Sequence, residues 1–242
     1  MRISFSGAAC TGKTTIIQSF LHKWPNYTLI DSKYRKLIKK NTKHSKETTP
    51  KLQKEILNLL VEESKPYTAH NRVVYDRCPL DNLVYTLWAH GKGKKGFTDS
   101  FVKETIETVK ESMRNLDIIF ICTRDFMPPV IQQNGIRETD PVFVEETNNI
   151  FKEISKQAQI DVEGSPFFPK GDSPGIINLY GNVEERLAQI SLYVTSEGNS
   201  FGEEQSFVSM DEINKMYSLL VDQKESLSEE QKLKLGILDL NK

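Results

Sequence analysis

The sequence has no long apolar run, few cysteines and almost no net charge. Its 242 residues carry a formal net charge of −1, and the three cysteines are Cys10, Cys78 and Cys122. A membrane-spanning helix needs about 20 consecutive apolar residues, so no membrane span is expected. The cysteines lack metal-type spacing and are odd in number, which favours a protein of the reducing cytoplasm. A strand-like stretch follows the first methionine directly, so we expect no secretory signal.

What the sequence does contain is a complete phosphate-binding motif. Residues 7–14 read Gly-Ala-Ala-Cys-Thr-Gly-Lys-Thr, that is, glycine, four residues, glycine, lysine and threonine. An alternating stretch that suits a strand precedes the motif, and apolar residues at helical spacing follow it. Strand, glycine turn and helix are the context that this motif requires. We therefore expect the chain to bind a nucleoside triphosphate.

The spacing of this loop has a physical purpose. Gly7 and Gly12 let the backbone turn where a side chain would clash. Successive backbone N–H groups can then surround an anion at the positive end of the next helix. Lys13 can reach the β- and γ-phosphates of ATP, and the Thr14 hydroxyl can bind Mg²⁺. The predicted nucleotide-binding residues are Gly7, Ala8, Ala9, Cys10, Thr11, Gly12, Lys13, Thr14 and Thr15.

Strand-like and helix-like segments alternate along the chain. Strands are predicted at residues 2–6, 27–30, 72–76, 117–122 and 176–179. Helices are predicted at residues 13–23, 33–40, 50–64, 80–90, 101–113, 141–158 and 183–193. This order predicts an α/β protein with the three-layer α/β/α fold of P-loop NTPases, in which a five-stranded, mainly parallel sheet lies between helices.

Local signals set several of these boundaries. Pro50 can occupy the first turn of a helix, and Asp140 and Asn182 are of the residue types that cap helices. After Thr195 the composition shifts to Gly, Ser and Glu. We therefore expect a P-loop domain at residues 1–194, followed at residues 195–242 by an acidic linker and a helical C-terminal extension.

Two aspartates follow predicted strands that should flank the loop. Asp31 ends the second strand and Asp76 ends the third. Ligands of open α/β sheets bind beyond the carboxyl ends of the strands, so both carboxylates should face the crevice that holds Lys13. Asp76 is suited to hold Mg²⁺ together with Thr14. Asp31 is a candidate general base for the attacking hydroxyl; the alternatives are Asp76 as the base and a helix-cap role for Asp31.

Three arginines are candidates for binding phosphate. Arg77 follows Asp76 directly, and its guanidinium can form two parallel hydrogen bonds to a phosphate of the acceptor. Arg137 lies on a glycine-containing stretch after the fourth strand, from which it can close over the γ-phosphate. Arg124, at the end of that strand, is the second choice for this role. The alternative for Arg124 and Arg137 is that they are exposed and pair with Asp125 or Glu138, and the alternative for Arg77 is that its pair with Asp76 only closes the end of the strand.

Three stretches together resemble the P-loop nucleoside and nucleotide kinases. They are residues 7–15, residues 75–82 (YDRCPLDN) and residues 134–141 (NGIRETDP). The resemblance covers about residues 1–193, and it is nearest to the NadR-type kinase domain and to the AAA-like P-loop ATPases of phage and bacterial genomes. It implies a phosphotransferase that moves the γ-phosphoryl group of ATP, with Mg²⁺, to a nucleoside or nucleotide. The catalytic residues predicted for such an enzyme are Lys13, Asp31, Asp76, Arg77 and Arg137.

The phosphoryl acceptor remains open at this stage. Basic residues gather at Lys33–Lys54 and at Lys92–Lys95, whereas the segment after Thr195 is acidic. The basic strips would suit a nucleotide phosphate or a DNA backbone, and they would equally suit a solvated lysine-rich surface. A second hypothesis is therefore a kinase that acts on nucleic acid, at a hydroxymethylated base or a polynucleotide end. A third is a nucleotide-dependent switch or ATPase whose tail binds a partner protein; the absence of a helical lid domain of the AAA-motor type argues against it.

Overall fold

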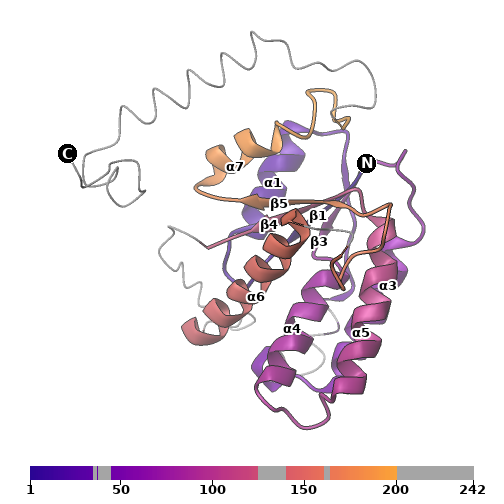
Figure 1. Cartoon of the computed structure of the whole chain (residues 1–242). Coiled ribbons are helices and arrows are strands. Elements are labelled where there is room, and N and C mark those ends of the chain that lie inside the picture. Colours follow the sequence, from indigo (N-terminus) through magenta and orange to yellow (C-terminus); the bar gives the residue numbers. More distant parts are fainter. Residues whose placement is uncertain (35–36, 38–44, 125–139, 161–163, 201–242) are drawn as a thin grey trace, which may run out of the picture. The chain divides into compact units, whose positions relative to one another are not determined.

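The computed structural model describes residues 1–34, 37, 45–124, 140–160 and 164–200. The chain divides into two units, residues 1–200 and 201–242, and all described residues belong to the first. Figure 1 shows how the strands and helices of this unit alternate along the chain. The elements are β1 Arg2–Ser6, α1 Lys13–Lys23, β2 Thr28–Leu29, the 3-10 turn η1 Ser45–Glu47, α3 Pro50–Ser64, β3 Val73–Asp76, α4 Pro79–Gly91, α5 Asp99–Ser112, the 3-10 turn η2 Met113–Asn115, β4 Ile118–Cys122, α6 Pro141–Ile160, β5 Gly175–Leu179 and α7 Val183–Ile190.

The sheet has five strands in the order β2-β3-β1-β4-β5, and every neighbouring pair is parallel. β1 lies in the centre, where Phe5 is in register with Asp76 of β3 and with Phe120 of β4. Because all strands run in one direction, their carboxyl ends meet at a single edge of the sheet. The predicted α/β fold with a five-stranded sheet is confirmed. The strand predicted at residues 27–30 is shorter than expected, because only Thr28 and Leu29 belong to β2.

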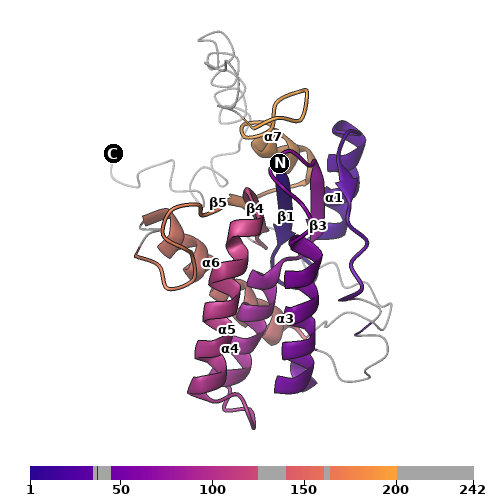
Figure 2. The same cartoon turned by 90° about the vertical axis from the view of Figure 1, so that its right-hand side faces the viewer.

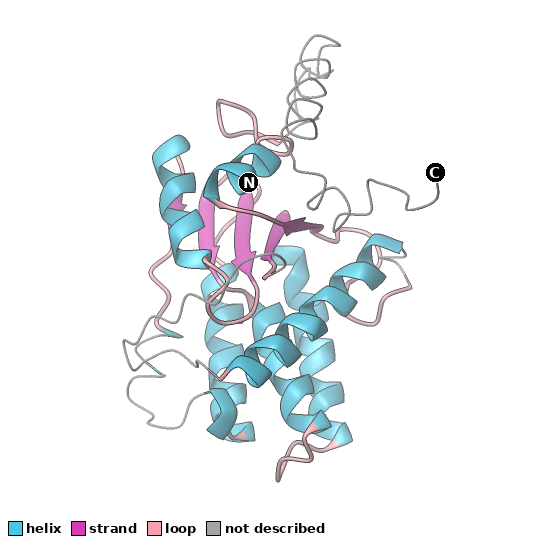
Figure 3. Cartoon of the chain, turned by 90° about the vertical axis from the view of Figure 1, so that its left-hand side faces the viewer, coloured by secondary structure: helices cyan, strands magenta, loops and turns pink. Residues whose placement is uncertain are grey.

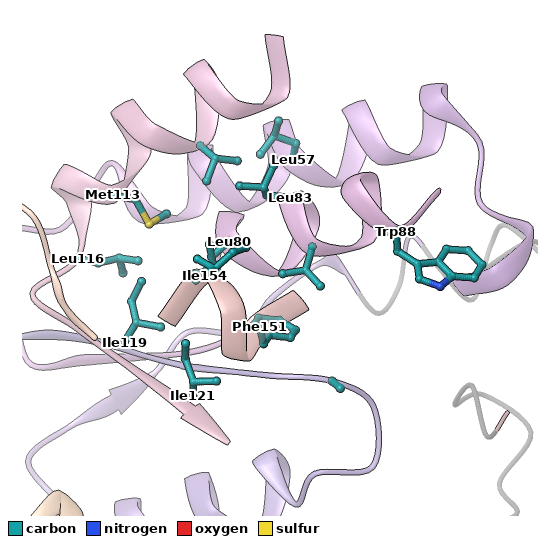
Figure 4. Packing of buried hydrophobic residues seen from close by; sticks show 14 of the residues in the cluster. Leu57, Leu80, Leu83, Trp88, Met113, Leu116, Ile119, Ile121, Phe151 and Ile154 are labelled. Carbon is teal, nitrogen blue, oxygen red and sulfur yellow. The ribbon is translucent and has the colours of Figure 1, made fainter. Parts of the chain in front are cut away.

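Helices cover both faces of the sheet, α1 and α7 on one and α3, α4, α5 and α6 on the other (Figures 1 and 3). Successive side chains of β4 point to opposite faces of the sheet and pack against the helices on both faces. Phe120 and Cys122 belong to the core beneath α1 and α7. Ile119 and Ile121 belong to the opposite core, where Figure 4 shows them below Leu80 of α4. Continuous apolar strands of this kind are typical of a parallel sheet that is buried on both sides.

Helices α3, α4 and α5 lie side by side on their face of the sheet (Figure 2). The predicted start of α3 is confirmed: Pro50 is its first residue, and the Thr49 hydroxyl accepts the Leu52 N–H at 3.3 Å. The predicted caps are confirmed too. Asp140 Oδ1 accepts the Val142 N–H at 2.8 Å, and Asn182 Oδ1 accepts the Glu185 N–H at 3.0 Å. These caps fix the helix starts, because they satisfy N–H groups that have no partner within the helix.

The last described residues form a turn that is bound at the amino ends of β2 and β3. The Trp24 indole donates to the Thr195 carbonyl at 2.7 Å, and the Tyr27 hydroxyl donates to the Gly198 carbonyl at 2.8 Å. Gly198 has a φ of +80°, and an added Cβ there would lie 2.9 Å from Asn26. The domain boundary expected near residue 195 stays a prediction, since residues 201–242 lie outside the described part. No helix in the described ranges is both long and apolar enough to cross a bilayer.

Candidate functional site

The loop between β1 and α1 contains three left-handed backbone conformations, at Gly7 (φ +136°), Cys10 (φ +59°) and Gly12 (φ +82°). A Cβ added to Gly7 would lie 2.5 Å from the carbonyl oxygen of Cys122 on β4. Gly7 therefore lets the loop pass against the neighbouring strand, which no other residue type permits. Gly12 is the N-cap of α1, so the positive end of this helix lies beside the loop.

The side chain of Lys13 folds back over the loop. Its ammonium donates to the Gly7 carbonyl at 2.8 Å and to the Ala8 carbonyl, and it lies 3.3 Å from the Thr11 hydroxyl. Lys13 is only 7% exposed. Burial and, after it, the nearby charge of Arg77 lower the pKa of Lys13 to about 8. The cation is thus held by neutral carbonyls, although anionic oxygens would be stronger partners for it.

Arg186 of α7 supports the same loop, and the sequence analysis did not single it out. Its guanidinium donates to the Thr11 carbonyl at 2.6 Å and to the Thr123 carbonyl at 2.8 Å. Arg186 is 3% exposed, so α7 places a buried charge between the loop and the end of β4. No local pattern signals this role, because it depends on contacts between segments far apart in the chain.

Asp76 and Arg77 lie at the carboxyl end of β3, next to the loop. Asp76 is in register with Phe5 of β1, and the Arg77 N–H donates to the Phe5 carbonyl at 3.1 Å. Arg77 has a φ of +86°, a left-handed conformation that is uncommon for a residue other than glycine. The adjacent strands β1 and β3 therefore bring Lys13, Asp76 and Arg77 to one edge of the sheet, as the sequence predicts.

The side chain of Arg77 is enclosed by polar and aromatic groups. Nη1 donates to Asp81 Oδ1 at 2.9 Å and to the Tyr85 hydroxyl at 3.2 Å. The guanidinium carbon lies 5.5 Å from the ring centre of Tyr34 and 5.6 Å from that of Tyr85. These contacts fix the plane of the guanidinium by charge, hydrogen bonding and cation–π attraction together.

Asp81 is a second residue whose role was not recognised in the sequence. It occupies the third position of α4 and is 1% exposed. Its carboxylate accepts the Cys78 N–H at 3.1 Å and the Gly7 N–H at 3.4 Å, besides the bond from Arg77. An acidic residue three positions after a helix start is a signal for a capping interaction, and it could have marked Asp81.

A hollow lies beside Asp76 and Arg77, between the ends of β2 and β3 and the helix α3. The Tyr75 hydroxyl is buried there and has no hydrogen-bond partner among the described residues. Glu63 of α3 accepts the Ser32 hydroxyl at 2.8 Å and the Lys33 N–H at 2.9 Å, which fixes the turn after Asp31. Residues lining the hollow include Ile30, Ser32, Glu63, Tyr75, Asp76 and Arg77.

The other predicted site residues lie further from the loop or outside the described part. Asp31 follows β2, the outer neighbour of β3, and is exposed. Arg124 follows β4 and Thr123, whose carbonyl accepts from Arg186, and it is partly exposed. Arg137 and most of the predicted lid lie outside the described residues, as does part of the basic stretch Lys33–Lys54.

The second basic cluster, Lys92–Lys95, makes contacts within the domain. The Lys92 ammonium donates to Glu146 of α6 at 2.5 Å, and Lys94 Nζ lies 5.3 Å from the ring centre of Trp88. Lys92 therefore links the end of α4 to α6, and Lys94 packs back on α4 itself. Gly93, between them, lies in a hydrogen-bonded turn, in which its N–H donates to the His90 carbonyl at 2.8 Å.

The loop and the strand order define a P-loop α/β protein, and comparison with known proteins agrees. A family model described as an AAA domain matches residues 2–165, and the chain belongs to this family. Deoxyadenosine kinase from M. mycoides, solved with dCMP and dCDP, is similar in structure, with a TM-score of 0.55 and 16% identity over 79% of this chain and 97% of that one.

Two further solved structures are similar. Thymidylate kinase from Candida albicans has a TM-score of 0.51 and 16% identity over 78% of this chain and 88% of that one. The NadR protein in complex with NR has a TM-score of 0.51 and 14% identity over 85% of this chain, but only 52% of NadR is covered. No curated protein matches the chain. The predicted resemblance to P-loop nucleoside and nucleotide kinases is confirmed, and these identities establish the fold.

Proposed function

We propose that this protein is a kinase that transfers the γ-phosphoryl group of ATP, with Mg²⁺, to a nucleoside or nucleotide. The observation that carries the proposal is the placement of two groups at one edge of the sheet. A phosphate loop with a buried lysine follows β1, and an Asp76-Arg77 pair ends the adjacent β3. A protein that only binds nucleotide would have no need of the second group.

On the donor side, the loop amides and Lys13 would hold the triphosphate. The Lys13 ammonium would exchange the carbonyls of Gly7 and Ala8 for phosphate oxygens, which are anionic and therefore stronger partners. Positioning and charge neutralisation supply most of the catalysis in phosphoryl transfer. Arg137 or, as the second choice, Arg124 is proposed to close over the γ-phosphate from the segment after β4.

The donor set also fits Mg²⁺. Thr14 is the second residue of α1 and Asp76 is the last residue of β3, so a hydroxyl and a carboxylate lie next to the loop. Mg²⁺ is usually bound by one or two such oxygens, with waters and substrate phosphates completing its shell. No cluster of three metal-binding side chains occurs among the described residues, and this mode of binding does not need one. When bound, the ion would neutralise charge on the β- and γ-phosphates.

On the acceptor side, Arg77 would bind and Asp31 would orient or deprotonate the attacking group. The side-chain hydrogen bonds of Arg77 to described residues use Nη1 alone. The edge formed by Nε and Nη2 is therefore left for an oxygen or phosphate of the acceptor. Asp31 lies between Ile30 and Ser32, which line the hollow, and Glu63 holds this turn by accepting the Ser32 hydroxyl and the Lys33 N–H.

A small acceptor is favoured over DNA by the contacts of the second basic cluster. Lys92 forms an ion pair with Glu146, so this cluster presents less net positive charge to a nucleic-acid backbone than the sequence suggests. Transfer to a hydroxymethylated base or a polynucleotide end remains the second candidate. Binding of such a polymer would weaken steeply with salt, whereas binding of a small acceptor would not.

The proposal is tested by incubating the protein with γ-labelled ATP, Mg²⁺ and separate pools of acceptors. The pools are nucleosides, nucleoside monophosphates, ribosylnicotinamide and DNA with modified bases. We expect label in a nucleoside or nucleotide, and none when Lys13→Ala replaces the native protein. Label in DNA would support the second candidate. Label only in inorganic phosphate would contradict both and favour an ATPase.

A further inference from the structure

The buried carboxylate of Asp81 forms hydrogen bonds with both the phosphate loop and Arg77. Oδ1 accepts from Arg77 Nη1 at 2.9 Å and from the Gly7 N–H at 3.4 Å, and Oδ2 accepts from the Cys78 N–H at 3.1 Å. Asp81 is 1% exposed. We propose that Asp81 is a positioning residue that sets the guanidinium of Arg77 against the first residue of the phosphate loop.

The backbone of Arg77 shows why such a residue is needed. Its φ of +86° is unfavourable for an arginine, and a strained conformation persists only where the surroundings hold it. The Phe5 carbonyl holds the main chain of Arg77, and Asp81 and Tyr85 hold its side chain. Of these two side-chain partners, Asp81 also forms a hydrogen bond with the phosphate loop, through the Gly7 N–H.

The charges around Asp81 lead to the same conclusion. Lys13 and Arg77 are two cations in a confined space, and the charge of Arg77 disfavours the protonated form of Lys13. Asp81 forms an ion pair with Arg77, and both side chains are largely shielded from water. A buried carboxylate between two buried cations offsets their repulsion, and removing it leaves a charge without compensation. Asp76, the other carboxylate near Lys13, is partly exposed.

A capping role alone does not explain these contacts. Asp81 is the third residue of α4, and its bond from the Cys78 N–H is what a helix cap requires. That bond uses only Oδ2. Oδ1 is directed to Arg77 and to Gly7, neither of which belongs to α4. The effect of Asp81 on turnover rests on the proposed kinase function, whereas its effect on Arg77 does not.

The first experiment measures the position of Arg77 without using activity. Proton–nitrogen NMR spectra record the arginine Nη–H signals, and Arg77→Lys identifies the signals of Arg77 by their loss. In the native protein the bond from Nη1 to Asp81 should slow rotation of the guanidinium, so that the Nη–H signals of Arg77 are resolved whereas those of exposed arginines are averaged. In Asp81→Asn the Arg77 signals should average like those of exposed arginines. An unchanged Arg77 signal in folded Asp81→Asn overturns the proposal.

The second experiment is a double-mutant cycle on phosphoryl transfer. Misplacement of a binding group costs on the order of 100-fold in rate, which is the loss in kcat expected for Asp81→Asn. If Asp81 acts through Arg77, the substitution should have little further effect in an Arg77→Ala background. Independent losses that multiply would overturn the proposal. If the native protein transfers phosphate to no acceptor, the kinase function fails, and the NMR result still decides the role of Asp81.

A matched control separates positioning from helix capping. Thr98 caps α5, where its hydroxyl accepts the Phe101 N–H at 3.3 Å, far along the chain from the loop. Thr98→Ala should lower the melting temperature but leave turnover and the Arg77 signal unchanged. Should Asp81→Asn fail to fold, Asp81→Ser serves in its place, because its hydroxyl can still accept the Cys78 N–H but is too short to reach Arg77. Native turnover and a native Arg77 signal in that variant would overturn the proposal.

Discussion

The two sides of the candidate site are built in different ways. The donor side is made of backbone: loop amides, three left-handed residues and the first turn of α1, with Lys13 bonded to the loop's own carbonyls. The acceptor side is made of side chains from separate elements, with Arg77 enclosed by Tyr34, Asp81 and Tyr85. One side is therefore encoded in a single continuous stretch, and the other depends on how distant segments pack.

This difference indicates which amino-acid substitutions should alter the choice of acceptor. A backbone cradle recognises phosphate, a group shared by all triphosphates, and any change to it should affect every acceptor equally. A surface of side chains can be altered one residue at a time, so the identity of the acceptor should be decided there. Substitutions on the donor side and on the acceptor side test this difference.

Lys13→Ala should lower turnover on the order of 1,000-fold, because it removes a cation that faces the transferred phosphate. The loss should be the same for every acceptor that the protein uses. Steady-state rates with two acceptors measure this, and Lys23→Ala is the control, since Lys23 is an exposed lysine at the end of the same helix. A near-native rate for Lys13→Ala would contradict the assignment of Lys13 and the loop as the binding site of the triphosphate.

Asp31→Asn should lower kcat on the order of 100-fold, because general-base catalysis contributes at least this much. The dissociation constant of ATP should stay near its native value, since Asp31 follows β2 and not the loop. Calorimetric titration with ATP, run beside the kinetic assay, separates the two quantities. An equal loss of kcat and ATP affinity would reduce Asp31 to a structural role; Asp172→Asn, at an exposed carboxylate, should change neither.

Gly7→Ala should destabilise the fold by about 1–3 kcal/mol, the cost of a strained backbone, to which the clash with Cys122 adds. Denaturant unfolding measures this free energy. Gly91→Ala, on the acceptor-side helix α4, is the matched control, because an added Cβ there meets no atom within 4 Å. That substitution should leave stability unchanged or raise it by up to ~1 kcal/mol. Equal effects at both glycines would contradict the loop geometry.

The pKa of Lys13, about 8, predicts a pH dependence confined to the donor side. The kcat/KM for ATP should be constant below that pH and fall about tenfold per pH unit above it, because deprotonated Lys13 no longer attracts phosphate. Bound phosphate favours the protonated amine, so with saturating ATP the decline in kcat should begin at higher pH. A profile for ATP that stays flat to pH 9.5 would contradict the burial of Lys13.

The difference between a continuous loop and side chains from distant segments also explains which features the sequence could predict. The observed β1 and α1 match the predicted bounds at residues 2–6 and 13–23, because a glycine loop between a strand and a helix is a local pattern. Asp140 and Asn182 were recognised as caps for the same reason. The placement of Asp76 beside the loop followed from parallel strand order, which is a rule of topology.

Features that depend on tertiary contacts could not be predicted from the sequence. Arg186 looks like one more charged residue of an amphipathic helix, and only the fold buries it against Thr11. The strand β2 is shorter than predicted because Tyr27 turns inward, where its ring lies 5.1 Å from Phe20 and its hydroxyl bonds Gly198. The left-handed backbone of Arg77 has no signal in residue type either. The roles of Asp31, Arg124 and Arg137 stay predictions.

Phosphorus NMR of the native protein with ATP, Mg²⁺ and a mixed pool of nucleosides and nucleotides tests the central claim most directly. The account predicts a new phosphate ester or anhydride resonance of an acceptor that grows in step with ADP. Growth of ADP together with inorganic phosphate alone, or no consumption of ATP at all, would contradict it.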